Sequence, residues 1–271
     1  MGQGDLGGPI DVPIWANSTG SGEKVVDFAD CNLLSDELLD HLSGLVKLRN
    51  VRVWGNQMTD AGLPKLAKLA ALKALTMDDT RVTGKGLKHI EHLKNLEEVS
   101  FYQAYLDDDG LASLAKLPKL RKLRLRGNIV GSGKGMAHLA TLENLAQIDL
   151  SETETDDSGL AELAKLPKLY DLNLWFTQVT DEGMREVAKM KQLTRLNLDN
   201  TRVGDAGVKI FSSLPKLEWL HLGKSKVTDE CIDDLIEIKT LKHVLLNNCP
   251  GVTDEGLDKL RKARPDVTIQ L

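Results

Sequence analysis

The chain has 271 residues, of which 41% are hydrophobic and 28% are charged, a composition typical of a soluble globular protein. No stretch offers the roughly 18 apolar residues that a membrane span requires. The 35 basic and 40 acidic residues are interspersed along the sequence and give a net charge of -5, so no basic stripe of the kind that nucleic acid requires is apparent. We therefore expect neither a membrane span nor a nucleic-acid partner.

Residues 1–24 are expected to form a capping hairpin segment against the strand that follows. Ile10 to Trp15, a polar turn at residues 17–22 and a strand at Val25 to Phe28 follow each other in the order of a hairpin. The first eight residues have neither the basic stretch nor the apolar core of a signal peptide. The localisation is therefore open between the cytoplasm and a trimmed secreted or periplasmic protein.

From residue 25 to residue 264 one pattern recurs. The leucines that open its apolar runs follow each other at a step of 24 residues, with one step of 25: Leu48, Leu72, Leu96, Leu120, Leu145, Leu169, Leu193, Leu217 and Leu241. The consensus around them is L-x-x-L-x-L-x-x-T-x-V-T-D-x-G-L-x-x-L-A-K-L-P-K. A regular repeat of this length indicates a solenoid, in which each unit buries its apolar face against its neighbours.

Each unit combines two hydrophobic periods. Leu172 and Leu174 alternate with polar residues, which predicts a short strand with one buried face. Met184, Val187 and Met190 then follow at helical spacing, which predicts an amphipathic helix. Strands that all run the same way predict a parallel sheet.

The T-D-x-G motif supplies the start of each helix. Thr180 and Thr228 suit the N-cap, and Asp181 and Asp229 place negative charge at the positive end of the helix dipole. The helices are expected to stop before prolines, namely Pro118, Pro167 and Pro215. Asp107 to Asp109 lack the alternating ligand spacing of a calcium-binding EF-hand, so we interpret them as helix caps as well.

Three residues after the last buried apolar residue of the strand, most units have a side chain with a hydroxyl, amide or thiol group. We expect these side chains to satisfy backbone groups where each strand ends: Thr80, Thr153, Thr177, Thr201, Asn56, Asn128, Ser225, Cys31 and Cys249. Cys31 and Cys249 are accordingly interpreted as buried residues, and the three cysteines as unbridged. Residues 131–135, which carry the extra residue of the 25-residue step, lack the motif of a phosphate-binding loop and are interpreted as a lengthened turn.

These V-T-D-x-G-L-x-x-L-A units resemble the ribonuclease-inhibitor-like leucine-rich repeats that are common in bacteria, especially planctomycetes. The resemblance covers residues 25–264 and implies an α/β fold, a right-handed horseshoe-shaped solenoid with a parallel sheet on its concave face and helices on its convex face. It also implies no catalytic apparatus and points to no particular ligand. Residues 265–271 are expected to add a C-terminal capping strand.

The residues between the buried leucines are expected to face the concave surface. Counting the opening leucine of a unit as position 1, these are positions 3, 5, 7 and 8. Aromatic residues are only 4% of the chain, yet several fall on these positions, and interfaces are enriched in aromatic and arginine anchors. The candidate ligand-binding residues are Trp54, Tyr102, Arg124, Arg126, Trp175, Phe176, Asp199, Trp219 and His221.

Lys122, Arg124 and Arg126 form a basic row on one strand. Glu98 and Asp149 on the neighbouring strands can pair with this row, or the row can meet an anionic group on a partner. Arg126 also lies close enough to Tyr102 for a cation-π contact.

The leading functional hypothesis is a non-catalytic module that binds a protein or peptide on its concave face. A glycan receptor is the alternative, because aromatic rings with Asp, Asn and Arg also suit sugars. A hydrolase that uses Asp199 and His221 is a remote third hypothesis, since no nucleophile accompanies this pair. We expect no cofactor and no metal ion.

Overall fold

The computed structural model describes residues 25–28, 35–42, 44–55 and 57–271. The expected N-terminal cap with Trp15, and the expected roles of Cys31 and Asn56, lie outside the described residues. Among the helices of the described part, none is both long and apolar enough to cross a membrane.

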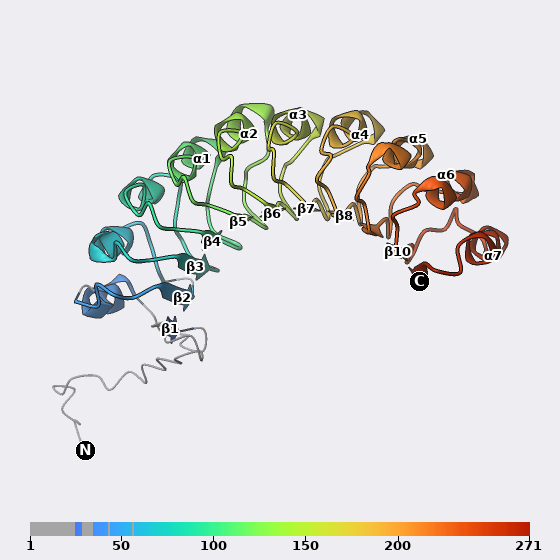
Figure 1. Ribbon diagram of the computed structural model, residues 1–271. Coiled ribbons are helices and arrows are strands. Elements are labelled where there is room, and N and C mark those ends of the chain that lie inside the picture. Colours follow the sequence, from blue (N-terminus) through green and yellow to red (C-terminus); the bar gives the residue numbers. More distant parts are fainter. Residues whose placement is uncertain (1–24, 29–34, 43, 56) are drawn as a thin grey trace, which may run out of the picture.

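The described residues form one parallel sheet of 11 strands that pair in sequence order. The strands are β1 (Val25–Phe28), β2 (Asn50–Trp54), β3 (Ala74–Asp78), β4 (Glu98–Ser100), β5 (Lys122–Arg124), β6 (Gln147–Asp149), β7 (Asp171–Asn173), β8 (Arg195–Asn197), β9 (Trp219–His221), β10 (His243–Leu245) and β11 (Thr268–Gln270). Equivalent positions pair across the sheet, as Leu172 does with Leu196 and Leu196 with Leu220. The sheet lines the inner side of a curved solenoid, with the helices outside (Figure 1).

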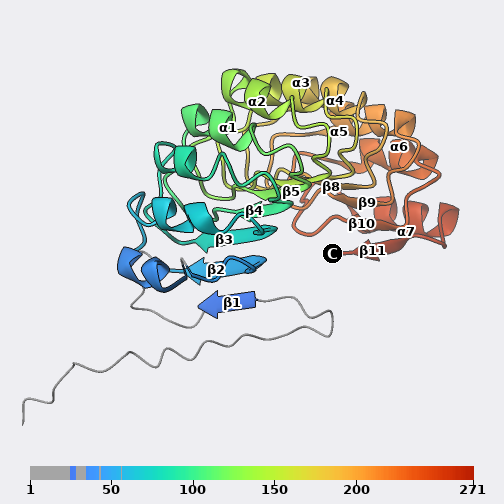
Figure 2. The ribbon, with the colours of Figure 1, turned by 60° about the vertical axis from the view of Figure 1, so that its left-hand side comes forward.

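Each helix lies between two consecutive strands on the outer side of the arc (Figure 2). Short 3-10 helices η1 (Asp36–Leu42), η2 (Leu63–Lys68) and η3 (Gly86–His89) come first, where amphipathic α-helices were expected. They are followed by α1 (Asp108–Leu114), α2 (Gly133–Leu139), α3 (Asp157–Leu163), α4 (Asp181–Val187), α5 (Asp205–Val208), η4 (Lys209–Ser213), η5 (Asp229–Cys231), α6 (Ile232–Glu237) and α7 (Asp254–Ala263). The helices end before Pro118, Pro167 and Pro215, as expected.

The core lies between the sheet and the helices. Leu172, Leu174 and Leu196 from the strand side and Met184 and Val187 from the helix side are all fully buried. The leucine register predicted from the repeat is therefore confirmed.

The polar residues at the ends of the strands bond backbone carbonyls, as expected. The hydroxyls of Thr177 and Thr201 donate to the carbonyls of the residues three places earlier, both at 2.7 Å. Asn128 donates to the Leu125 carbonyl and accepts from the Leu106 N–H. Within the described residues the buried cysteines, Cys231 and Cys249, are not bridged, and the Cys249 thiol donates to the Leu222 carbonyl at 3.0 Å.

The aspartate at the second position of the T-D motif reaches into the following unit, including Asp157, whose unit has Asp156 in place of the threonine. Asp157 accepts from the Thr180 backbone N–H at 2.9 Å and from the Thr180 hydroxyl at 2.7 Å. Thr180 caps α4 in turn, because its hydroxyl accepts from the Glu182 N–H. The predicted N-caps at Thr180 and Thr228 are confirmed, whereas the aspartates do more than complement the helix dipole: they tie neighbouring units together.

The glycine-rich stretch 131–135 differs from the expected lengthened turn. Only Gly131 and Ser132 precede the helix, since α2 begins at Gly133 and Ser132 is its N-cap. Gly131 has φ +140°, and a Cβ there would lie 2.2 Å from the Thr155 nitrogen. Backbone freedom and close packing both require glycine at this inserted residue.

Candidate binding face

Every unit from β2 to β10 leaves its strand through a left-handed residue at position 8. The non-glycine residues there have φ between 50° and 57°: Asp79, Gln103, Glu152, Phe176, Asn200, Lys224 and Asn248. Glycine fills the same position at residues 55 and 127. Asn, Asp and Gly tolerate this conformation, whereas a bulky aromatic residue is an outlier. Phe176 is that outlier, and 57% of it is exposed.

One end of an aromatic and arginine row begins at Trp54. Its ring packs edge-on against Tyr102 with 6.1 Å between ring centroids. The guanidinium carbons of Arg124 and Arg126 lie 4.5 Å and 5.1 Å from the centroid of the Tyr102 ring. The expected cation-π contact of Arg126 with Tyr102 is therefore confirmed, and Arg124 makes a second one.

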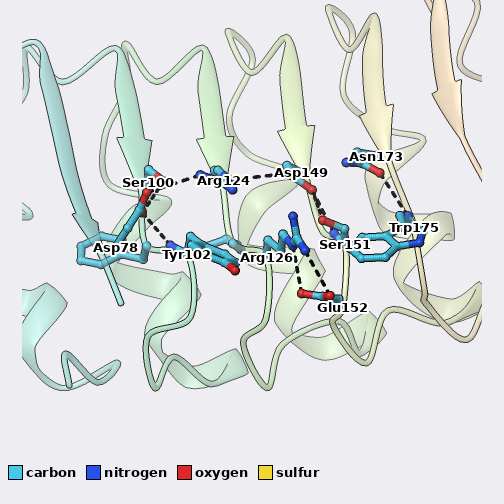
Figure 3. A network of polar contacts seen from close by, with 12 residues as sticks. Asp78, Ser100, Tyr102, Arg124, Arg126, Asp149, Ser151, Glu152, Asn173 and Trp175 are labelled. Carbon is cyan, nitrogen blue, oxygen red and sulfur yellow. Dashed lines mark hydrogen bonds and ion pairs between the residues drawn. The ribbon is translucent and has the colours of Figure 1, made fainter. Parts of the chain in front are cut away.

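The row continues toward β7. Arg126 also lies over the ring of Trp175, at 4.6 Å from its centroid. Trp175 and Phe176 then have centroids 6.4 Å apart with tilted rings. We call these six residues, Trp54, Tyr102, Arg124, Arg126, Trp175 and Phe176, the aromatic row; Figure 3 shows Tyr102, Arg126 and Trp175 side by side.

Internal pairing neutralises the arginines of this row. Arg124 lies 3.4 Å from the nearly buried Asp78 and 3.5 Å from Asp149. Arg126 donates twice to Glu152, at 2.9 Å and 3.1 Å (Figure 3), and this hydrogen bonding raises the pKa of Arg126. Of the two alternatives left open by the sequence, internal pairing is favoured for Arg124 and Arg126. Asp149 is a partner as expected, but Asp78 and Glu152 take the place of Glu98.

A second cluster lies on β8 to β10. Arg195 covers the ring of Trp219 at 4.5 Å, and Trp219 packs edge-on against His221 at 5.8 Å. His221 Nε2 lies 2.7 Å from Asn247 Oδ1 and 3.8 Å from Asp199. The sheet thus brings together Trp219, His221 and Asp199. Trp54, on β2, lies toward the other end of the sheet.

The chemistry of the Asp199–His221 pair is limited by its surroundings. The nearby thiol of Cys249 has a pKa raised by burial, so it is a poor nucleophile. Within the described part of the chain, no three histidine, cysteine or acidic side chains are grouped so that they could hold a metal ion. Two buried atoms there have no hydrogen-bond partner, Trp175 Nε1 and Asp199 Oδ1.

Several residues of this face were not among the candidates. Asp78, Arg195 and Asn247 occupy positions 7, 3 and 7 of their units, so the position rule that selected the candidates also covers them. They were missed because the choice followed aromatic side chains, the basic row and the Asp199–His221 pair. Glu152 was missed because its contact with Arg126 depends on the left-handed turn at position 8.

A curved parallel sheet with helices on its outer side defines a solenoid repeat protein. Residues 23–264 match the family model described as "Leucine-rich repeat region", and the chain belongs to the leucine-rich repeat family. Domains of this family generally act as protein-interaction modules and are typically non-catalytic.

Two solved structures from Listeria monocytogenes have a similar fold. An internalin, inlF, is 19% identical with a TM-score of 0.60, over 88% of this chain and 82% of that one. Internalin C2 is 24% identical with a TM-score of 0.59, over 71% of this chain and 77% of that one. No curated protein sequence matches significantly. At these identities the likeness shows the fold alone.

Proposed function

We propose that this leucine-rich repeat domain binds a protein or peptide, without catalysis, on its concave face along the aromatic row. The observation that carries the proposal is the continuous contact from Trp54 through Tyr102 and Arg126 to Trp175 and Phe176. Aromatic and arginine residues are the usual anchors of protein interfaces.

Exposure at both ends of the row supports this role. Trp54 is 42% exposed and Phe176 is 57% exposed, and exposed large apolar groups that cluster on one face commonly mark interaction sites. Between them the arginines are already paired with acids, so the middle of the row is preorganised and close to neutral. Such a surface suits a partner with apolar side chains better than a highly charged one.

The glycan alternative has weaker support. Sugars are commonly bound on free faces of aromatic rings, but Arg126 covers one face of Trp175 and Arg195 covers one face of Trp219. The remote hydrolase hypothesis has the Asp199–His221 proximity in its favour and no suitably activated nucleophile in the described residues. The finer assignment to ribonuclease-inhibitor-like repeats of bacterial, planctomycete type is also part of this proposal, and it is supported by the V-T-D-x-G-L-x-x-L-A motif.

A random peptide-display library selected on the wild-type protein tests the proposal. Calorimetry then compares the affinity of recovered peptides for wild type, Trp54→Ala and Phe176→Asn. Loss of one anchor is expected to weaken binding by about 2 kcal/mol, roughly thirtyfold. Arg185→Ala is the control, since this exposed arginine lies on α4, on the convex side.

Equal affinities for wild type and both anchor variants, with Arg185→Ala weakened, would move the site to the convex side. A glycan array provides the competing readout. A glycan that binds the wild type and loses binding in Phe176→Asn, in the absence of peptide binding, would replace the proposal with the glycan alternative.

A further inference from the structure

Charged residues are mixed along the sequence, but the fold sorts them across its width. The chain crosses from each helix back to the next strand along one edge of the solenoid, which we call the return edge. It comprises residues 44–49, 69–73, 90–97, 115–121, 140–146, 164–170, 188–194, 214–218, 238–242 and 264–267. The return edge has fifteen basic and five acidic side chains, a net charge of +10 in a molecule of net charge -5.

The repeat is the cause of this sorting. The consensus segment L-A-K-L-P-K places two lysines per unit at the same edge, and successive units stack them in rows. Lys116, Lys119, Lys165 and Lys168 follow this pattern and are all exposed. The T-D aspartates occur at the other edge, where each strand passes into its helix. Basic and acidic residues, which are evenly mixed along the sequence, are therefore separated in the folded structure.

Lysines of the return edge differ in how far their charge is compensated. Six of them pair with glutamates: Lys73, Lys116, Lys165, Lys189, Lys239 and Lys242. A second set bonds only neutral oxygens among the described residues: Lys94, Lys119, Lys168, Lys191 and Lys216. Within the described residues, Lys119, Lys168, Lys191 and Lys216 are held in place without an acidic partner, whereas Lys94 also lies near Glu91.

Amide side chains position three of these lysines. Lys119 donates to Asn95 at 2.7 Å, Lys168 to Asn144 at 2.7 Å and Lys216 to Gln192 at 2.6 Å. The two asparagines are anchored in turn, because their amide N–H groups donate to carbonyls of the preceding unit. The result is a line of three held cations, each two units from the next.

We propose that the return edge is a second interaction surface, which binds an acidic segment of a protein partner. Carboxylates are the matching chemistry for separate ammonium groups that can each donate three hydrogen bonds. This surface is distinct from the aromatic row, and its existence does not depend on what the concave face binds.

Two other anionic occupants fit less well. A nucleic-acid duplex is wider than this edge. Its uniform negative charge would therefore also approach the acidic edge and the other faces of a molecule with net charge -5. A second copy of this chain would have to offer rigidly placed exposed acids, such as Glu154, Glu182 and Glu230, whereas a flexible segment can match the lysine spacing. A short acidic peptide segment meets neither obstacle.

The test uses a fluorescent dodecamer of alternating glutamate and glycine, whose anisotropy reports binding to the wild-type protein. The triple variant Lys119→Gln, Lys168→Gln, Lys216→Gln is expected to weaken binding at least about fivefold, the combined effect of three exposed ion pairs. The triple variant Lys85→Gln, Lys134→Gln, Lys226→Gln removes the same charge at the opposite edge and is expected to change binding less than about twofold. Raising the salt concentration should weaken binding to the wild type.

Absence of binding at low salt, or an equal loss in both triple variants, would overturn the proposal. Tighter binding of a 12-base-pair DNA duplex than of the peptide, with the same dependence on Lys119, Lys168 and Lys216, would assign the edge to nucleic acid instead. Phe176→Asn is expected to leave peptide binding at the return edge unchanged, so failure here and failure of the concave-face function are separate results.

Discussion

Phe176 combines an exposed aromatic ring with a left-handed backbone, φ +55°. The left-handed conformation costs about 1–2 kcal/mol for a residue with a Cβ, whereas its half-exposed contact with Trp175 contributes about 0.5 kcal/mol. Phe176→Asn is therefore expected to raise the free energy of unfolding by about 0.5–1.5 kcal/mol, because asparagine tolerates this conformation. Urea denaturation of the two proteins measures the difference.

Tyr105→Asn is the matched control for Phe176→Asn. Tyr105 is exposed to a similar degree, 62%, but it is not among the residues with positive φ. Its replacement offers no backbone relief and is expected to leave stability unchanged or lower. A stability loss in Phe176→Asn would contradict the idea that this phenylalanine is retained for contact with a partner.

Gly183 shows how the repeat constrains a single residue. A Cβ at this helical position would lie 2.2 Å from Asp157 Oδ1, the oxygen that accepts from the Thr180 N–H. Replacing an exposed helical glycine by alanine ordinarily stabilises by about 0.5–1 kcal/mol. Here Gly183→Ala is expected to destabilise by about 1–3 kcal/mol, the range for overpacking, as a lower midpoint in urea.

The control for this sign reversal is Gly44→Ala, because a Cβ at Gly44 would meet nothing within 4 Å. It is expected to change the midpoint little. If Gly183→Ala proved as harmless as Gly44→Ala, the close approach of Asp157 to the helix of the next unit would be wrong.

At the level of whole elements, two units show how the aspartate–threonine hydrogen bonds between neighbouring units can be replaced. Gly84 and Gly133 stand where other units have the T-D aspartate. In each following unit the N-cap threonine is itself replaced by aspartate: Asp107 accepts from the Gly110 N–H and Asp156 from the Gly159 N–H, both at 3.0 Å. The first helix of each unit from η2 to α7 therefore has one carboxylate bonded at its cap, either from the preceding unit or from its own N-cap residue.

This compensation predicts the outcome of a double-mutant cycle at Asp157 and Thr180. Asp157→Gly alone removes two hydrogen bonds to Thr180 and is expected to cost about 1–2 kcal/mol. Thr180→Asp alone places two carboxylates together and is also expected to destabilise. Together they reproduce the arrangement of Gly133 and Asp156, so we expect a favourable coupling of about 1 kcal/mol or more. If the losses of stability in the two single variants simply added in the double variant, the proposed compensation between the two positions would be wrong.

The elements themselves were largely predictable, because burial depends on a spacing that the sequence displays. Leu172 and Leu196 had to be buried once the period-two pattern was recognised, and the capping threonines followed from the T-D motif. The left-handed turn at position 8 was missed, although Asn200, Asn248 and the glycines at 55 and 127 were its signal. The sequence analysis treated position 8 only as a concave-surface position and did not consider its backbone conformation.

The candidate residues were predictable only as positions. The repeat placed Tyr102, Arg126 and Trp175 on one face, and the structure brings them into contact. Which acid pairs with each arginine depends on side-chain rotamers and on the turn at Glu152, and neither follows from spacing. The charged return edge was missed for a different reason. Basic and acidic residues are mixed along the sequence, but the repeat of 24 residues places them on opposite edges of the folded solenoid.

At the scale of the whole molecule, the last described repeat is stabilised by one buried cation. Arg264 is only 8% exposed and stands where other units have a buried leucine such as Leu214. Its guanidinium donates to the carbonyls of Ile238 and Leu241, both at 2.9 Å. It also donates twice to Asp266, which holds the pKa of Asp266 below its usual range.

The depressed pKa of Asp266 gives this contact a pH dependence. Because the folded pKa lies below the unfolded one, the stabilisation is present above about pH 4 and is lost as the pH falls below that value. Protonation of Asp266 leaves the bonds from Arg264 to the backbone carbonyls in place, so acid should loosen this end less than removal of the arginine does.

Arg264→Ala is expected to loosen α7 and β11 without affecting the central units, because a solenoid unit is stabilised mainly by its direct neighbours. Hydrogen bonds to a charged group contribute about 1.5–3 kcal/mol, so amides in residues 254–270 should exchange at least about tenfold faster by hydrogen-exchange mass spectrometry. Arg261→Ala, which removes an exposed arginine of the same helix paired with Asp258, should leave exchange unchanged. Uniformly faster exchange from β2 to β11 would instead mean that Arg264 stabilises the solenoid as a single cooperative unit.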